Sequence, residues 1–212
     1  HVGSIARPRA LLDLASSVKG PPEDPAEYAR VLRASVVEVV RQQVEAGIDV
    51  VNDGDFGKSN WANYVLGRLS GFERRPDKAP LVWLGRDRER FPEVIAREFE
   101  PTQEAFYTQA CTSAIRYTTH DEVLRDIGNL QAALQAAPAT EAFITAVAPA
   151  SAVFNGRNEF YSSEREYIFA LAEALREEYL AIHRAGFLVQ VDDAVLANMY
   201  DHLVQQSPAH YR

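Results

Sequence analysis

Three polar residues follow a short apolar run in the first third of the chain. Asn52, Asp53 and Asp55 surround Gly54, directly after the β-branched segment 48–51. In parallel α/β folds ligands bind at the carboxyl ends of strands, and a carboxylate there is suited to binding an ammonium group. The same residue types are common in ordinary Asp-Gly turns. At this position the sequence therefore leaves open both a ligand site and a plain turn.

A second unit with the same order of residues occurs near the far end of the chain. Residues 185–186 are Ala-Gly and lead into the apolar run 187–191, which is followed by the acidic pair 192–193. Residues 46–47 lead into the run 48–51 in the same way. In both units a glycine follows a helix, and an apolar strand precedes an acidic residue. This order of residues, which occurs twice, predicts βα units.

Helices and strands are expected to alternate along the chain. An N-cap at Asp24 and capping boxes at Thr119 and Ser163 predict three helices, ending near 47, 134 and 186. Strands are expected near residues 1, 48, 107, 144 and 188. This alternation predicts an α/β fold with a parallel sheet, either an open five-stranded sheet or the first five units of a barrel, since a complete (β/α)₈ barrel takes about 250 residues. The charged segment 73–101 is expected to form a lid or binding loop.

Composition narrows the class of protein. The 212 residues are 47% hydrophobic and 25% charged, as in a globular domain. A formal net charge of −8 argues against a nucleic-acid partner, and no apolar run reaches the roughly 18 residues of a membrane span. Cys111, the single cysteine, excludes an internal disulfide and indicates a reducing, cytoplasmic location.

Three segments together resemble a known family. They are the opening Val2-Gly3-Ser4, the run from Ile48 to Phe72, and the run from Leu188 to Ala197, in order along nearly the whole chain. They resemble the catalytic barrel of cobalamin-independent methionine synthase and its single-barrel relatives. The resemblance implies a TIM barrel that brings a thiol such as homocysteine, a zinc ion and a methyl-tetrahydrofolate-type donor to its C-terminal face, for methyl or alkyl transfer to the thiol.

The resemblance also implies substrate-binding residues. The Gly-Ser pair would hold the carboxylate and amino groups of homocysteine, and Asp55 stands where the family has a glutamate that contacts the amine. Asp192, in a Gln-x-Asp run, matches an aspartate that also touches the amino acid. The predicted substrate-binding residues are His1, Gly3, Ser4, Asp53, Asp55, Gln190 and Asp192. Aspartate in place of glutamate at 55, and Ala194 in place of proline, are departures that favour a paralogue of the synthase.

The family's zinc ligands, a His-x-Cys pair with a further acid and cysteine, do not appear by Arg212. The resemblance therefore implies that zinc is bound outside this chain, with no metal ligand within it. Residues 1–212 are expected to form one partial TIM-barrel domain, completed by a further C-terminal segment or a second chain that covers the exposed edge strand.

Two other functions remain open on the sequence. A uroporphyrinogen-decarboxylase-like barrel shares the fold and needs no metal, although Arg7 and Arg9 are the only arginines near the opening segment. A non-catalytic binding subunit would also account for the missing ligands.

Overall fold

The main sheet has three parallel strands. The computed structural model describes residues 3–14, 22–59, 63–75, 86–94, 96–97, 108–198 and 200. Within these ranges β1 (Val50–Asn52), β4 (Glu141–Val147) and β6 (Leu188–Asp192) pair in the order β1-β4-β6. The predicted α/β class with a parallel sheet is confirmed.

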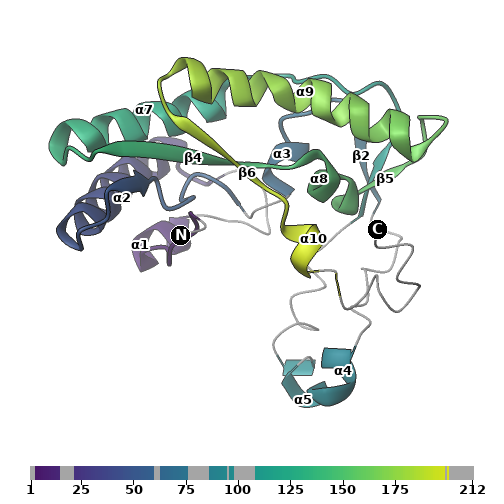
Figure 1. Cartoon of the computed structure of the whole chain (residues 1–212), viewed down its shortest axis with the longest axis horizontal. Coiled ribbons are helices and arrows are strands. Elements are labelled where there is room, and N and C mark those ends of the chain that lie inside the picture. Colours follow the sequence, from purple (N-terminus) through teal and green to yellow (C-terminus); the bar gives the residue numbers. More distant parts are fainter. Residues whose placement is uncertain are drawn as a thin grey trace.

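Three long helices pack on one face of this sheet. They are α2 (Pro25–Glu45), α7 (Asp121–Ala136) and α9 (Glu164–Arg184), of which α7 and α9 run alongside β4 and β6 in Figure 1. Ala142, Ile144 and Ala146 of β4 lie in their apolar core. Because side chains alternate along a strand, Thr145 is left on the opposite face, where the candidate site lies.

The expected helix ends are largely confirmed. Oδ1 of Asp24 accepts hydrogen bonds from the backbone N–H groups of Ala26 (3.1 Å) and Glu27 (3.0 Å), so Asp24 is the N-cap of α2. Ser163 caps α9 by accepting from the N–H of Glu166. Gly47, which follows α2, has φ +81°, a value that L side chains rarely adopt.

Of the two side chains in the capping box predicted at Thr119, Thr119 bonds to the helix end, but the part predicted for Glu122 is wrong. Thr119 accepts from the N–H of Asp121 at 3.1 Å, but α7 begins at Asp121 with His120 as N-cap. The carboxylate of Glu122 does not turn back to the helix end, because it pairs with Nε of Arg68 at 2.8 Å. A long-range ion pair has replaced the local cap.

A second sheet contains the strand that was expected near residue 107. It consists of β2 (Phe72–Arg75), β3 (Thr108–Cys111) and β5 (Gly156–Asn158), in the order β2-β3-β5, with β2 antiparallel to β3. The prediction that this strand belongs to the parallel sheet is wrong. Cys111 is buried in a separate apolar cluster built around α9, so packing there outweighs addition to the main sheet.

Two further expectations change. Gly3 and Ser4 are not in a strand, and His1 and Val2 lie outside the described residues. The described parallel sheet therefore has three strands where five were expected. The start of the predicted lid, 73–75, belongs to β2, and 86–94 holds two short helices; most of the remainder lies outside the described residues.

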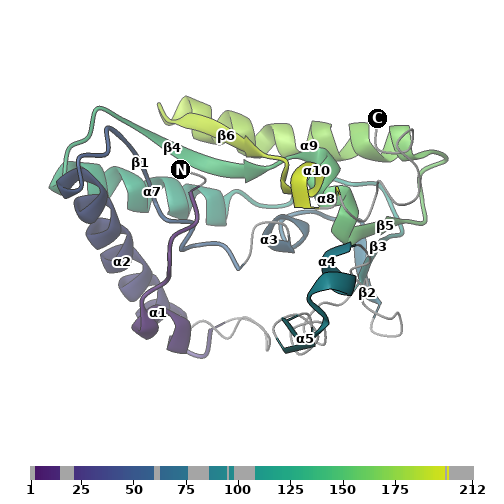
Figure 2. The same ribbon diagram turned by 60° about the horizontal axis from the view of Figure 1, so that its bottom comes forward.

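Short helices complete the described structure. They are α1 (Arg9–Leu14), α3 (Asn63–Leu66), α4 (Arg86–Arg90), α5 (Pro92–Val94), α8 (Pro149–Asn155) and α10 (Ala194–Asn198). Figure 2 shows α3, α8 and α10 near the ends of β4 and β6. Among the residues described, no helix has the length and apolar character needed to cross a membrane.

Candidate functional site

The polar run after β1 forms a tight turn whose side chains bond to its own backbone. Oδ1 of Asn52 accepts from the N–H of Gly54 at 3.2 Å, and Oδ1 of Asp53 accepts from the N–H of Asp55 at 3.0 Å. Gly54 (φ +72°) and Asp55 (φ +59°) both lie in the left-handed region. A non-glycine residue there is uncommon and marks a backbone held in place by its surroundings.

Asp55 is paired with a lysine that the sequence analysis did not single out. Nζ of Lys58 lies 2.9 Å from Oδ1 of Asp55 and 2.7 Å from the backbone oxygen of Thr145, and it also donates to the Thr145 hydroxyl. That hydroxyl donates to Oδ1 of Asp55 at 2.5 Å. Burial alone would lower the pKa of Lys58, but the charges of Asp55 and Asp53 outweigh it and raise that pKa. Lys58 is therefore a buried, charged ammonium group.

Asp53 is almost fully buried, with 1% of its surface exposed. Burial raises the pKa of Asp53 from 3.8 to about 6, and the charge of Lys58 partly opposes the rise. Its carboxylate is directed to the backbone of the turn.

The opening segment packs on this turn. Nδ2 of Asn52 donates to the backbone oxygen of Gly3 at 2.9 Å, and the N–H of Ile5 donates to the oxygen of Gly54 at 3.1 Å. Gly3 has φ +107°, and a Cβ added there would lie 2.5 Å from Cγ2 of Thr145. Only glycine fits this close approach. Ser4 is exposed, and His1 lies outside the described residues.

The acidic end of β6 lies at the same edge of the sheet. Gln190 pairs in register with Thr145, and Asp192 pairs with Val147. Nε2 of Gln190 donates to Oδ1 of Asp192 at 2.9 Å. Burial raises the pKa of Asp192; the charge of Asp55 adds to that rise and Lys58 opposes it. The structure thus brings Gly3, Asp53, Asp55, Gln190 and Asp192 to one edge.

The comparisons with known proteins are consistent with one another. No protein-family model matches the chain. Methionine synthase of Thermococcus kodakarensis is 26% identical over 206 residues, which cover 94% of this chain and 53% of that protein. Methionine synthase of Saccharolobus islandicus is 24% identical over 196 residues, with 92% and 52% covered. A B12-independent methionine synthase from Shewanella sp. W3-18-1, solved with selenomethionine, aligns with a TM-score of 0.67 at 18% identity, over 97% of this chain and 53% of that one.

The chain is similar in sequence to curated methionine synthases, and its fold is similar to that of a B12-independent methionine synthase. It spans about half the length of the curated relatives it matches. The family resemblance in the sequence is therefore confirmed, while the roles of the individual residues stay predictions.

Next to the edge that holds Asp55 lies a buried charge network that sequence reasoning missed. The Arg68 side chain contacts Oε2 of Glu178 at 2.9 Å and Oδ2 of Asp126 at 3.3 Å, and all three side chains are almost fully buried. The ring of Tyr64 lies between the cations, with its centroid 5.4 Å from Nζ of Lys58 and 4.8 Å from Cζ of Arg68. Tyr64 thus connects Lys58 to α9, since the Tyr64 hydroxyl donates to Oε1 of Glu178.

Some of these residues had a signal in the sequence. Lys58 stands three positions after Asp55, in the same polar run, and an acid and a base at that spacing often pair. Thr145 and Glu178 had none, since a threonine in an apolar strand and a glutamate on an amphipathic helix are ordinary. Their partners lie 87 and 110 residues away in the sequence.

The described residues do not fit a zinc site. No three His, Cys, Asp or Glu side chains gather there in a metal-binding arrangement. Cys111 is buried in β3, and its thiol donates to the backbone oxygen of Ser113 at 3.4 Å. Burial raises the pKa of this thiol, which disfavours the thiolate that binds metal.

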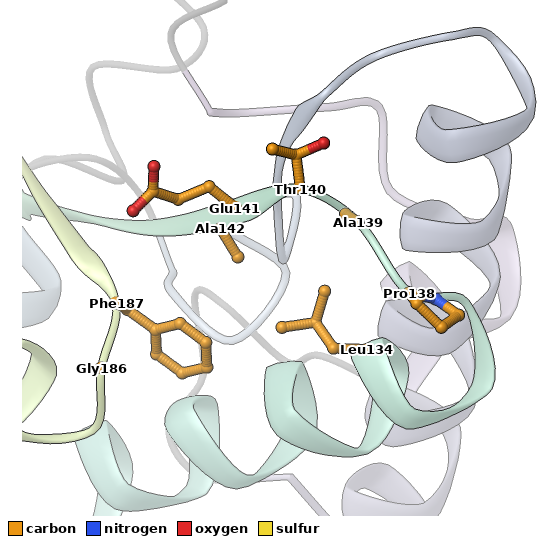
Figure 3. Close-up of a pocket in the computed structure, with 8 residues that line it drawn as sticks. All are labelled: Leu134, Pro138, Ala139, Thr140, Glu141, Ala142, Gly186 and Phe187. Atoms are coloured by element: carbon orange, nitrogen blue, oxygen red, sulfur yellow. The ribbon is translucent and has the colours of Figure 1, made fainter.

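A hollow at the opposite end of the sheet does not belong to this edge. Figure 3 shows its lining at the start of β4 and before β6, with Leu134, Ala142 and Phe187 among the side chains. It lies at the amino ends of the strands, away from Asp55 and Asp192. We assign no role to it.

Proposed function

We propose that this chain supplies the thiol-substrate site of a cobalamin-independent methyltransferase. The reaction is transfer of a methyl group to a thiol such as homocysteine, from a donor of the methyl-tetrahydrofolate type. The observation that carries the proposal is the pair of acidic strand ends, Asp55 after β1 and Asp192 on β6, which face one edge of a parallel sheet. The relation to methionine synthases supports the reaction class.

Each residue at the edge has a role in this proposal. Asp55 and Asp192 bind the ammonium group of the substrate, as charge-assisted acceptors. Gly3 and Ser4 hold its carboxylate through backbone groups, and Gln190 orients Asp192 through their hydrogen bond. His1 is proposed to face the same pocket. The Shewanella relative was solved with selenomethionine, the selenium analogue of the methylated product.

The reaction needs an activated thiol, because a thiol with a pKa of about 8.5 is largely protonated at neutral pH. A zinc ion supplies that activation when it coordinates the sulfur. Since the described residues do not fit a zinc site, we propose that its ligands lie on other residues. The proposed contribution of this chain is to bind and orient the thiol.

We also propose that residues 1–212 form one domain that is part of a TIM barrel in the cytoplasm. Among the described residues β6 pairs only with β4. Leu188 and Val191 of β6 are 47% and 49% exposed, although an apolar parallel strand is normally covered. A further C-terminal segment or a second chain that pairs with β6 would cover them.

A methyl-transfer assay tests the function. The full-length protein is incubated with L-homocysteine and 5-methyltetrahydrofolate, and methionine is measured. We expect methionine to form, and Asp192→Asn to slow its formation. Binding of homocysteine without transfer under zinc-replete conditions would identify a binding subunit. Absence of both binding and transfer would reject the proposal.

A further inference from the structure

The two carboxylate oxygens of Asp55 have different surroundings. Oδ1 accepts from Nζ of Lys58 at 2.9 Å and from the hydroxyl of Thr145 at 2.5 Å. Oδ2 accepts no hydrogen bond from any residue in the described part of the chain. It faces Gly3, where an added Cβ would lie 3.5 Å from Oδ2. Oδ1 is fixed by two protein donors, whereas Oδ2 lies beside Gly3 without a hydrogen-bond donor among the described residues.

Lys58 itself has no proton left for a ligand. An ammonium group has three donors, and those of Lys58 go to Oδ1 of Asp55, to the backbone oxygen of Thr145 and to the Thr145 hydroxyl. Its side chain is also buried. Lys58 therefore acts on the carboxylate of Asp55 and does not contact a ligand.

The backbone of the turn is held by a second cation. Nη2 of Arg7 donates to the backbone oxygens of Asp55 at 3.0 Å and of Lys58 at 2.6 Å. These two hydrogen bonds hold the backbone at Asp55, which has a left-handed conformation, and at Lys58. A strained residue of this kind persists only where its surroundings over-determine it, and such residues cluster at functional sites.

Asp55 lies at the edge of the sheet that Asp192 shares. β1 and β6 flank β4, and Thr145 of β4 donates to Oδ1 of Asp55 and pairs in register with Gln190, two residues before Asp192. Two carboxylates near each other favour a cation between them. Because the three donors of Lys58 go to Oδ1 and to Thr145, Lys58 makes no hydrogen bond to Oδ2, and we expect a cation at Oδ2 to come from the ligand.

We propose that Lys58 is a positioning residue: with Thr145 it fixes Oδ1 of Asp55, so that Oδ2 is held ready for the ammonium group of an amino-acid thiol. The inference rests on the proposed function, which makes the ligand an amino-acid thiol. It adds that recognition of the ammonium group depends on a residue that never touches it.

The test compares two ligands on the full-length protein by calorimetry. One is L-homocysteine, and the other is 4-mercaptobutanoate, the same thiol without its amino group. We expect the wild type to prefer homocysteine by roughly tenfold or more, the usual effect of a charged hydrogen bond. Lys58→Met is expected to remove most of this preference, and Lys58→Arg, which keeps the charge, to retain it in part.

Arg125→Met is the matched control. Nη2 of Arg125 donates to the backbone oxygen of Gly57 at 3.0 Å and to Oδ1 of the buried Asp126 at 2.9 Å. Its loss therefore perturbs the same turn and a neighbouring buried ion pair, and within the described part of the chain it removes no hydrogen bond to Asp55. The preference for homocysteine should be unchanged in this variant. Thermal unfolding of each variant shows whether it is folded. If Lys58→Met is not folded, Thr145→Val tests the positioning role instead. We then expect Thr145→Val to lose severalfold of the preference for homocysteine over 4-mercaptobutanoate.

The outcomes separate the two proposals. An unchanged preference in folded Lys58→Met, or in Thr145→Val if that variant decides, would overturn the positioning role. Equal weakening of both ligands in Lys58→Met would do the same, since it shows a purely structural effect. Equal binding of both ligands to the wild type would keep thiol binding and reject the ammonium contact. Binding of neither ligand would reject the proposed function together with the inference.

Discussion

Nη1 of Arg68 lies 2.9 Å from Oε2 of Glu178, and both side chains are almost fully buried. The pair joins the segment after α3 to the middle of α9. The hydroxyl of Tyr64 donates to Oε1 of Glu178 at 3.1 Å and accepts from the N–H of Val147 at the end of β4. The position of the acidic edge therefore depends on a charge network behind it.

Arg68→Met should destabilise the protein strongly. The variant leaves the carboxylate of Glu178 buried without its cation, and it leaves the buried carboxylate of Asp126 with Arg125 as its remaining cation partner among the described residues. Breaking a buried pair by removing one partner costs about 3–5 kcal/mol. Urea unfolding followed by circular dichroism measures the loss.

Glu122→Gln is the control for this prediction. Glu122 contacts the same arginine at 2.8 Å, but its side chain is 49% exposed. Exposed pairs contribute about 0–1 kcal/mol. An equal loss of stability in the two variants would contradict the view that burial makes this network important.

Titration of Asp53 should lower the free energy of unfolding as pH rises from about 4 to about 6. Burial raises the pKa of Asp53 from 3.8 to about 6, so in this range the folded state holds a proton that the unfolded chain has lost. The favourable contribution is complete below the lower pKa and is lost as pH passes the higher one. From this shift it amounts to about 3 kcal/mol.

Asp53→Asn isolates the effect, because asparagine keeps an oxygen for the N–H of Asp55 and does not titrate. The stability of the variant relative to the wild type should rise between pH 4 and pH 7 in urea unfolding. A constant difference between the two proteins over this range would show that Asp53 titrates normally.

The edge of β6 should be protected in the full-length protein. If a further strand pairs with it, the amide protons of 188–192 exchange as slowly as those of β4 in hydrogen-exchange measurements. The partner strand would also cover Leu188 and Val191. Exchange as fast as in exposed loops would show that β6 remains an open edge.

The sequence predicted the elements whose signals are local. Asp24 and Ser163 cap the helices where expected, and the glycines at 47 and 186 end them, since these depend on residues a few positions apart. The acidic strand ends followed from the same reasoning together with the resemblance. The short strand β2 was missed, because its four residues, Phe-Glu-Arg-Arg, have no apolar alternation and pair only through β3.

Long-range partners limited the prediction of the site. The sequence presents Asp55 as a free carboxylate, while the fold brings Thr145 to it from 90 residues away. Glu122 was assigned to a local cap because nothing nearby in the sequence announces Arg68, 54 residues before it. Such partners are set by packing of the whole fold, which local patterns do not encode.

The most direct test of the account is calorimetric titration of the full-length protein with L-homocysteine, in the wild type, Asp192→Asn and Asp193→Asn. Asp193 is the matched neighbour, since its carboxylate accepts from the hydroxyl of Ser151 at 2.7 Å. We predict saturable binding to the wild type and unchanged affinity in Asp193→Asn. In Asp192→Asn the binding free energy should weaken by about 1.5–3 kcal/mol. Equal affinity in all three proteins would contradict the assignment of the acidic strand ends as the substrate site.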